Sequence, residues 1–413
     1  MPAEIITIGT ELLTGQVLDT NAASIASELM AIGIEVGSKT TVGDNERSIE
    51  EALRQALERS DIIIATGGLG PTEDDVTKKV FSRVLGKRLV LNEEILAKIR
   101  HRFSSRGLPM SPSHEKQALI PRGAKVLDNP KGTAPGLFIR SGPKTVVALP
   151  GVPAEMKQIL VGQVIPLLQQ IYKGKGRIKS RVLKTCSLVE SQVDHALGDL
   201  IRTSRNPTIS LLAYPGEVHI CLTAKGASDE EVEGLLSGLE ARFREALEGH
   251  IFGRDEQTLE EVVGLLLREK GKTLALAESC TGGLIGHRLT NIPGSSTYFE
   301  RAVVAYSNRA KEALLGVPAE LLRQRGAVSR EVAEAMADGI RRLARTHIGI
   351  GVTGIAGPTG GSQEKPVGLV YLALSHEGGI VSQEHRFLGD RETNKFRASQ
   401  MALEMLRRHL LQT

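Results

Sequence analysis

Short apolar runs alternate with helical patterns over the first part of the chain. Three runs rich in Ile, Val, Ala and Thr predict strands: residues 3–9, 34–41 and 61–66. Between them, a helix over residues 20–32 carries apolar side chains on one face, and Ser48 with Glu51 forms a capping box for a helix that ends near residue 58. A further helix is predicted over residues 76–85. Strands that alternate with helices indicate an α/β fold with a doubly wound sheet.

The last part of the chain repeats this alternation around a glycine-rich turn. Residues 273–277 are an apolar run that predicts a buried strand, and a helical pattern resumes at residues 284–289. The turn between them holds Ser279, Thr281, Gly282 and Gly283. A strand that feeds a helix in this way directs free backbone N–H groups at one point, which suits an anion. Other elements predicted here are helices over 258–270 and 331–345 and a strand over 347–354.

The stretch between these two parts predicts a small α+β domain. Residues 181–252 show strand and helix patterns in alternation, and they follow a basic stretch that comprises Lys173, Lys175, Arg177, Lys179 and Arg181. We interpret the basic stretch as a solvated linker and edge strand, because charge on an edge blocks aggregation. The chain therefore divides into predicted domains over residues 1–170, 171–253 and 254–413, each of α/β or α+β type.

Composition and charge narrow the class of protein. A chain of 413 residues with 41% hydrophobic residues is long enough for two or three domains, and a net charge of +4 is too weak to indicate a nucleic-acid partner. The three cysteines show no disulfide or zinc spacing, which fits a reducing cytosol. We find no signal peptide and no run of 18 apolar residues, so we predict a cytoplasmic protein without a membrane span.

Three side chains after the glycine-rich turn are suited to covalent chemistry: Ser296, Tyr306 and Lys311. Serine becomes a nucleophile when a neighbouring base takes its proton, and lysine or tyrosine can replace histidine in that role. Ser295 and Cys280 are rivals for the nucleophile. Each residue also has an ordinary structural explanation: Ser296 as the N-cap of a helix over 297–301, Tyr306 as a strand residue and Lys311 as a solvated helix charge.

Carboxylates and glycines also follow the predicted N-terminal strands. Ligands of doubly wound sheets bind past the carboxyl ends of the strands, where glycine allows close approach and acids can hold a divalent metal. The glycines are Gly9, Gly67, Gly68 and Gly70, and the acids, which we predict as metal ligands, are Glu11, Asp44, Asp74 and Asp75. A diphosphate held through such a metal is one interpretation, and ordinary polar turns are the other.

Seven sequence blocks resemble the C-terminal domain of the CinA family (competence/damage-inducible protein A). In order they are 277–283 (AESCTGG), 294–296 (GSS), 306–311 (YSNRAK), 326–329 (GAVS), 354–358 (GIAGP), 364–368 (EKPVG) and 389–391 (GDR). The resemblance implies a nicotinamide mononucleotide deamidase that needs no cofactor, with Ser296 as the nucleophile and Tyr306 and Lys311 as its activating partners. The expected substrate-binding residues are Ser279, Thr281, Gly282, Gly283, Thr353, Gly354, Ala356, Gly357 and Arg391.

The N-terminal part resembles the molybdopterin-binding fold in the form found in the CinA family. The matching blocks are 9–13 (GTELL), 43–45 (GDN), 66–75 (TGGLGPTEDD) and 149–153 (LPGVP). Leu69 stands where molybdenum-cofactor proteins usually have threonine, which weakens the case for pterin binding. The family instead implies hydrolysis of ADP-ribose to AMP and ribose 5-phosphate with Mg, Mn or Co, and possibly K. It also implies a KH-like middle domain and a homodimer.

Two other classes of protein stay open at this point. The first is a pterin- or nucleotide-binding protein without catalysis, which intact Ser296, Tyr306 and Lys311 argue against. The second is a nucleic-acid-associated protein that acts in competence, which the weak charge and the absence of a Gly-x-x-Gly clamp in the middle domain argue against. We assign no role to His347 and His385, which are expected to flank strands.

Overall fold

The computed structural model describes residues 2–172 and 176–412. These residues form two compact units, each made of two segments of the chain. The first unit comprises the chain up to Lys179 together with Ala224–Gly234, and the second comprises Ser180–Thr223 together with the chain from Leu235 onward. Lys173 and Lys175 of the predicted basic linker lie outside the described residues.

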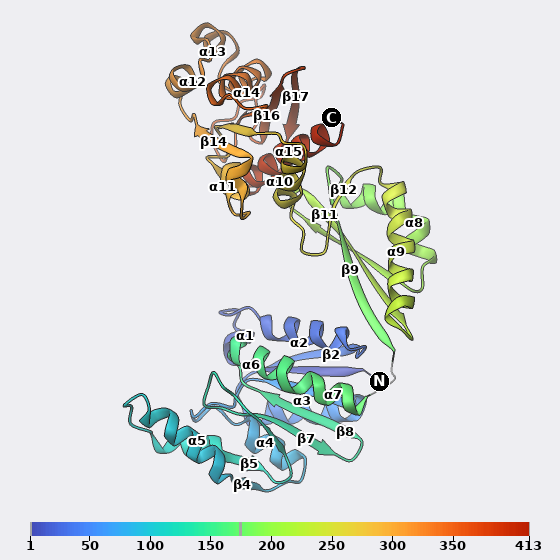
Figure 1. The fold of residues 1–413 in the computed structure, drawn as a ribbon. Coiled ribbons are helices and arrows are strands. Elements are labelled where there is room, and N and C mark those ends of the chain that lie inside the picture. Colours follow the sequence, from blue (N-terminus) through green and yellow to red (C-terminus); the bar gives the residue numbers. More distant parts are fainter. Residues whose placement is uncertain (1, 173–175, 413) are drawn as a thin grey trace. The chain divides into compact units, whose positions relative to one another are not determined.

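The first unit is built on a mixed six-stranded sheet with the strand order β2-β1-β3-β8-β7-β6 (Figure 1). Its strands are β1 Ala3–Ile8, β2 Val36–Val42, β3 Ile62–Thr66, β6 Lys125–Leu127, β7 Gly136–Ser141 and β8 Lys144–Leu149, and a hairpin pairs β4 Leu89–Leu91 with β5 Leu119–Pro121. Strands β2, β1, β3 and β8 are parallel to one another, and β7 is antiparallel to both of its neighbours, β8 and β6. Parallel strands with helices on both faces confirm the predicted doubly wound class.

Alternate residues of β1 and β3 serve two cores, one on each face of the sheet. Ile6 and Ile63 pack with helices α3 to α5, whereas Ile5 and Ile64 pack with α2, α6 and α7. The helices are α1 Thr10–Leu13, α2 Thr20–Ala31, α3 Glu46–Arg59, α4 Thr77–Val84, α5 Glu93–Ser104, η1 Pro112–Ala118, α6 Pro153–Ile159, the π-helical η2 Leu160–Val164 and α7 Ile165–Ile171.

One local prediction in this unit is wrong. Helix α3 begins at Glu46 because the Asn45 side chain accepts from the N–H of Ser48, so Ser48 is not its N-cap.

The middle domain has a four-stranded sheet with the order β10-β11-β9-β12. Its elements are β9 Arg177–Cys186, α8 Glu190–Thr203, β10 Thr208–Tyr214, β11 Glu217–Gly226, α9 Asp229–Ala246 and β12 Ile251–Arg254. Strand β9 lies between β11 and β12, but β12 pairs only with Leu183–Thr185, so among the described residues the basic start of β9 is left at an edge of the sheet. The basic side chains at its start are neutralised by acids of α9: Arg177 and Lys179 by Asp229, and Arg181 by Glu240.

The C-terminal domain has a five-stranded sheet with the order β14-β13-β15-β16-β17, of which the first three strands are parallel. Its strands are β13 Leu274–Glu278, β14 Phe299–Val304, β15 Ile348–Gly354, β16 Leu369–His376 and β17 Gly379–Arg386. Its helices are α10 Leu259–Glu269, α11 Leu284–Thr290, η3 Ser295–Thr297, α12 Asn308–Leu315, α13 Ala319–Arg325, α14 Arg330–Ala344 and α15 Arg391–Gln412.

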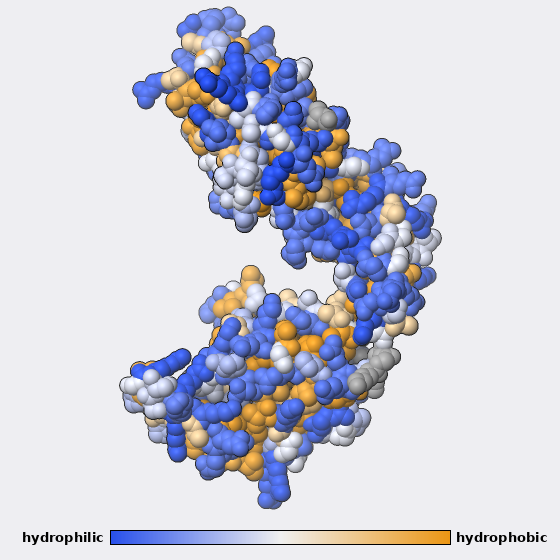
Figure 2. Space-filling view, viewed as in Figure 1, coloured by the Kyte–Doolittle hydropathy of each residue, from blue (hydrophilic) through white to orange (hydrophobic). Residues whose placement is uncertain are grey.

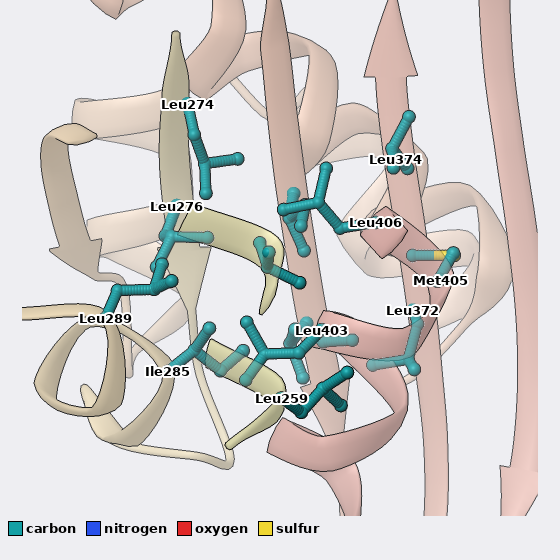
Figure 3. Packing of buried hydrophobic residues seen from close by; sticks show 14 of the residues in the cluster. Leu259, Leu274, Leu276, Ile285, Leu289, Leu372, Leu374, Leu403, Met405 and Leu406 are labelled. Atoms are coloured by element: carbon teal, nitrogen blue, oxygen red, sulfur yellow. The ribbon is translucent and has the colours of Figure 1, made fainter. Parts of the chain in front are cut away.

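Strand β13 places large side chains on one face and small ones on the other. Leu274 and Leu276 pack against α10, α11 and α15 (Figure 3), whereas Ala275 and Ala277 face the core that contains α14. Glycines of β15 share the face toward α14: a Cβ atom on Gly351 would lie 2.3 Å from the carbonyl oxygen of Ala333. Small residues therefore let α14 lie directly on the sheet, and this close packing holds the carboxyl ends of β13 and β15 in place.

The middle and C-terminal domains are joined by hydrogen bonds within the second unit. Gln400 of α15 donates to the Glu217 carboxylate at 2.7 Å, and Arg407 of the same helix donates to the carbonyl oxygen of Gly249 at 2.5 Å. The Arg407 guanidinium is also paired with Glu404 inside α15. Away from this contact, the visible face of the middle domain is mainly hydrophilic (Figure 2).

Candidate active site at the carboxyl end of strand β13

The turn after β13 is held together by a buried carboxylate. The Glu278 side chain is fully buried and accepts hydrogen bonds from the backbone N–H groups of Gly283 at 3.0 Å, Ile285 at 3.2 Å and Gly286 at 2.8 Å. A carboxylate at a helix N-terminus satisfies donors that the helix itself leaves free. The N–H of Gly283, which we had expected to bind an anionic ligand, is therefore already used by the protein.

This turn brings Ser279 against Lys311. The Nζ of Lys311 lies 3.0 Å from the Oγ of Ser279 and also donates to the carbonyl oxygens of Ala305 at 2.8 Å and Tyr306 at 3.5 Å. Ser279 is 8% exposed and Lys311 1% exposed, which is rare for lysine. Lys311 comes from α12, whose N-cap Ser307 directly follows the chain that leaves β14. The Ser279–Lys311 pair thus depends on two neighbouring strands that end at the same edge.

Burial favours the neutral form of this lysine. Desolvation lowers the pKa of Lys311 from its ordinary value of 10.5, and this effect outweighs the opposing influence of Cys280. A neutral amine could donate its two hydrogens to the two carbonyl oxygens and accept the Ser279 hydroxyl proton with its lone pair. The contacts of Lys311 are therefore those required of a base for Ser279.

Cys280 is not suited to act as the nucleophile. Burial raises the pKa of its thiol to about 12, with Glu278 adding to the shift. The thiol therefore stays protonated at neutral pH, and the reactive thiolate does not form. This argues against the cysteine alternative.

The structure does not bring Ser296 to Lys311 within one chain. Strand β14 runs parallel to β13, with Phe299 beside Leu274 and Val304 beside Glu278. Ser296 precedes β14 and is exposed in η3, at the amino edge of the sheet, whereas Ser279 and Lys311 lie at the carboxyl edge. The five steps from Phe299 to Val304 alone separate these edges by about 17 Å. The predicted arrangement of Ser296, Tyr306 and Lys311 as one bonded group is therefore wrong within one chain. The alternative explanation of Ser296 as the N-cap of a helix over 297–301 does not hold either, because η3 and β14 occupy these residues.

Tyr306 belongs to a second group beside the Ser279–Lys311 pair. Its side chain is 60% exposed, and its hydroxyl accepts from Nη2 of Arg391 at 2.9 Å. Nη1 of Arg391 donates to the carbonyl oxygen of Gly357 at 2.6 Å. The structure thus brings Tyr306, predicted as catalytic, together with Gly357 and Arg391, predicted as substrate-binding, but it joins Tyr306 to Lys311 through the Tyr306 backbone only.

The remaining predicted residues of this domain lie along the same edge. The N–H of Ser279 donates to the carbonyl oxygen of Val352, next to Thr353, whose hydroxyl donates to the carbonyl oxygen of Ala327. Gly354 ends β15, and the carbonyl oxygen of Ala356 accepts from buried Asn394 at 3.1 Å. The hydroxyl of Thr281 is fully buried and has no hydrogen-bond partner among the described residues.

Two backbone donors of the turn lie near the sulfur of Cys280 rather than an oxygen acceptor. Among the described residues, neither the N–H of Cys280 nor that of Thr281 donates to an oxygen acceptor. Both N–H groups lower the pKa of the Cys280 thiol, so they lie close to its sulfur. Because Cys280 directly follows Ser279, its N–H is the backbone donor that comes next after the candidate nucleophile.

Lys395 is a candidate that the sequence analysis missed. A Cβ atom placed on Gly282 would lie 3.7 Å from Nζ of Lys395, so this ammonium lies over the Ser279 turn. Lys395 is one helical turn after Arg391 in α15, and both line a cavity of about 620 Å³ that also includes Leu284 at the start of α11. The signal in the sequence is the i, i+4 spacing of two cations at the start of a helix, where cations are not expected from helix electrostatics.

The predicted N-terminal site is only partly brought together. A Cβ atom on Gly67 would lie 2.0 Å from the carbonyl oxygen of Ile8, so the ends of β1 and β3 touch, and Gly68 follows directly. The Asp44 carboxylate accepts from the N–H of Thr10, next to Gly9, at 2.7 Å. The Asp75 carboxylate accepts from the N–H groups of Gly70 and Thr72, both at 2.8 Å.

These contacts leave the four predicted metal ligands apart. Asp44 and Asp75 are used to hold loops, and Glu11 and Asp74 are exposed. Over residues 2–172 and 176–412, no three acids, histidines or cysteines converge closely enough to hold a metal ion. The side chains as arranged do not fit the predicted metal, and we derive no reaction step through it. Over the same residues, no helix is both long and apolar enough to cross a membrane.

Comparison with known proteins covers almost the whole chain. Residues 4–170 match the probable molybdopterin binding domain, residues 180–253 the damage-inducible protein CinA KH domain and residues 256–410 the CinA C-terminal domain. A putative competence-damage inducible protein of Moorella thermoacetica is 48% identical over 410 residues, or 99% of each chain. A CinA-like protein of Dictyoglomus turgidum is 44% identical over the full length of both chains.

A solved structure, that of the protein CinA with unknown function from Thermoplasma acidophilum, is 40% identical and covers 40% of this chain and 97% of its own, with a TM-score of 0.38. The full-length identity to the curated relatives decides the family. The chain belongs to the CinA family and combines a molybdopterin-binding-like domain, a KH-like domain and a CinA C-terminal domain.

Proposed function

We propose that the C-terminal domain hydrolyses the carboxamide of nicotinamide mononucleotide, giving nicotinic acid mononucleotide and ammonia, with Ser279 as the nucleophile and Lys311 as its base. The observation that carries the proposal is the buried contact of 3.0 Å between Ser279 Oγ and Lys311 Nζ. The resemblance of this domain to nicotinamide mononucleotide deamidases supplies the substrate, and the geometry replaces Ser296 with Ser279.

The reaction proceeds in two halves. Neutral Lys311 takes the proton of Ser279 while Oγ attacks the carboxamide carbon, and the N–H groups of Cys280 and Thr281 stabilise the oxyanion. Lys311 then returns the proton to the departing nitrogen, the C–N bond breaks, and ammonia leaves an ester on Ser279. A water molecule, deprotonated by Lys311, attacks that ester and releases the carboxylate product and the serine hydroxyl.

Arg391 and Lys395 bind the phosphate of the mononucleotide. Both cations line the cavity at the start of α15, and Lys395 lies over the Ser279 turn. The planar guanidinium of Arg391 suits two phosphate oxygens, and Lys395 adds a second positive charge. Tyr306 is exposed and is held by a hydrogen bond from Arg391, so its ring lies beside the Arg391 guanidinium.

The test is ammonia release from nicotinamide mononucleotide by four proteins: the wild type, Ser279→Ala, Lys311→Met and Ser296→Ala. We expect the first two variants to lose at least about a thousandfold in kcat, because loss of a nucleophile or its base removes most of the catalysis. Ser296→Ala is the matched control and should keep its activity. Activity that persists in Ser279→Ala and disappears in Ser296→Ala would overturn the assignment, and an inactive wild type would overturn the function.

For the N-terminal domain, the family resemblance supports hydrolysis of ADP-ribose. The supporting geometry is the meeting of Gly9, Gly67 and Gly68 at the carboxyl ends of β1 and β3, the edge at which doubly wound sheets bind their ligands. Release of AMP from ADP-ribose, measured with Mg, Mn or Co in turn and compared with a Gly68→Val variant, tests it. Dimer formation and a cytoplasmic location stay predictions, and light scattering tests the former.

A further inference from the structure

A second cavity of the C-terminal domain lies at the sheet edge opposite Ser279. It has a volume of about 670 Å³ and is lined by residues from the starts of β13 and β15, the end of β16 and the ends of α14 and α15. Six of the lining residues are basic or imidazole side chains: Lys272, Arg341, Arg345, His347, His376 and His409. We call this group the cationic cavity. One carboxylate, that of Glu377, lines it as well.

The permanent charges of the cationic cavity are not all neutralised by the protein. Arg341 donates to Ser375 at 2.9 Å and pairs with Asp338 at 3.4 Å. By contrast, the side chains of Lys272 and Arg345 form no hydrogen bond or ion pair with any described residue. Two cations that converge on one cavity without a counterion raise the local positive potential, which favours an anionic ligand.

The imidazoles add hydrogen-bond donors rather than acceptors. Nδ1 of His347 accepts from the backbone N–H of Thr273 at 3.1 Å, and Nδ1 of His376 accepts from that of Gly378 at 3.2 Å. A backbone N–H can only donate, so each ring carries its hydrogen on Nε2. The ring of His376 also packs on that of His409, with centroids 4.4 Å apart. The pKa of His409 is lowered by burial and by the neighbouring His376 and Lys272.

Helix electrostatics explain only part of this cluster. Cations are favoured in the last turn of a helix, which accounts for Arg341 and His409. Lys272, His347 and His376 come from strand ends, where no such preference exists. These side chains come from separate elements and converge on the cationic cavity, as expected of a site that binds oxygen-rich anions.

We propose that the cationic cavity binds a phosphate ester, with the phosphate held by Lys272, Arg345 and the Nε2–H donors of His347 and His376. A phosphate dianion matches the two cations that lack a counterion, and its oxygens accept from ammonium, guanidinium and imidazole N–H groups. The cavity has room for more than a phosphate, and the imidazoles of His376 and His409, tilted by 48° to each other, line the space left for the rest of the ligand. The site is distinct from the Ser279–Lys311 pair, since it lies at the amino ends of β13 and β15.

The probes are ribose 5-phosphate and inorganic phosphate, measured on the full chain by equilibrium dialysis. Hydrogen exchange of the peptides around Arg345 and His376 locates the binding. Lys272→Glu and Arg345→Glu should each weaken ribose 5-phosphate binding by about 10- to 100-fold, the equivalent of one charge-assisted hydrogen bond. Arg323→Glu is the control, because Arg323 is exposed on α13 and pairs with Glu320.

Each outcome decides one part of the proposal. The site is supported if the ligand protects the peptides around Arg345 and His376 from hydrogen exchange, if both charge reversals abolish this protection, and if Arg323→Glu retains it. Unchanged affinity in Lys272→Glu and Arg345→Glu, or no protection at millimolar ligand, overturns it. Tighter binding of inorganic phosphate than of ribose 5-phosphate would overturn the assignment to an ester. Equal melting temperatures of the three variants show that lost binding is not lost folding.

Discussion

Replacing the buried carboxylate of Glu278 by the amide of glutamine isolates its role in holding the Ser279 turn. The two Oε atoms of Glu278 accept three backbone N–H groups, those of Gly283, Ile285 and Gly286. Glutamine offers a single acceptor oxygen. In its better orientation it keeps the bonds to Gly283 and Ile285 and turns its NH₂ group toward the N–H of Gly286.

The cost can be worked out from these three bonds. One buried donor without an acceptor costs about 1–3 kcal/mol, and loss of the charge on the acceptor weakens each of the other two bonds by about 1 kcal/mol. Removal of a buried charge returns part of this cost, since its desolvation is no longer required. We therefore expect Glu278→Gln to destabilise the turn and the start of α11 by about 3 kcal/mol.

Hydrogen exchange followed by mass spectrometry measures the loss of stability in the turn and in α11 directly. A local method is needed because the several domains of the chain need not unfold together. A loss of about 3 kcal/mol should speed exchange of the α11 amides by about a hundredfold if these amides open locally. Glu300→Gln is the matched control, because Glu300 is exposed on β14 and pairs with Arg301. Exchange in α11 that stays the same in both variants would refute the reasoning, because Glu278 would then contribute little to holding these donors.

Three further predictions concern the base, the packing and the substrate. Since the pKa of Lys311 is lowered, deamidation should rise with pH and level off below the ordinary lysine value of 10.5, and Lys311→Arg, which stays charged, should abolish the rise. Gly351→Ala forces a Cβ atom to 2.3 Å from the carbonyl oxygen of Ala333, so a thermal melt should show that the free energy of unfolding falls by about 1–3 kcal/mol. The control Gly234→Ala places its Cβ atom in open space and should leave that free energy unchanged. Arg391→Ala should raise KM for nicotinamide mononucleotide at least about tenfold, and an unchanged KM would remove the phosphate role.

The contrast between Ser279 and Ser296 shows what a linear motif can and cannot decide. Both serines lie in blocks that resemble the CinA C-terminal domain, and both are followed by residues suited to a turn. The sequence predicts that Ser279 follows a strand, but it carries no sign that Ser296 precedes one and so lies at the opposite edge of the sheet. That depends on β14 running parallel to β13, a long-range pairing that puts Ser296 before one strand and Ser279 after the other.

The sequence by itself determined the α/β class, the first three strands of the N-terminal sheet with helices α2 to α4, the family and the stretch that holds the candidate site. Apolar periodicity and glycine turns encode these features locally. The tertiary structure alone decided that Lys311 is buried beside Ser279, that Glu278 occupies the N–H groups expected to bind an anion, and that Lys395 joins Arg391. It also gathered the cationic cavity from segments up to 137 residues apart, from Lys272 to His409. Such sites depend on which strand ends share an edge, and the physical reason that the sequence does not reveal them is that pairing between distant strands leaves no local pattern.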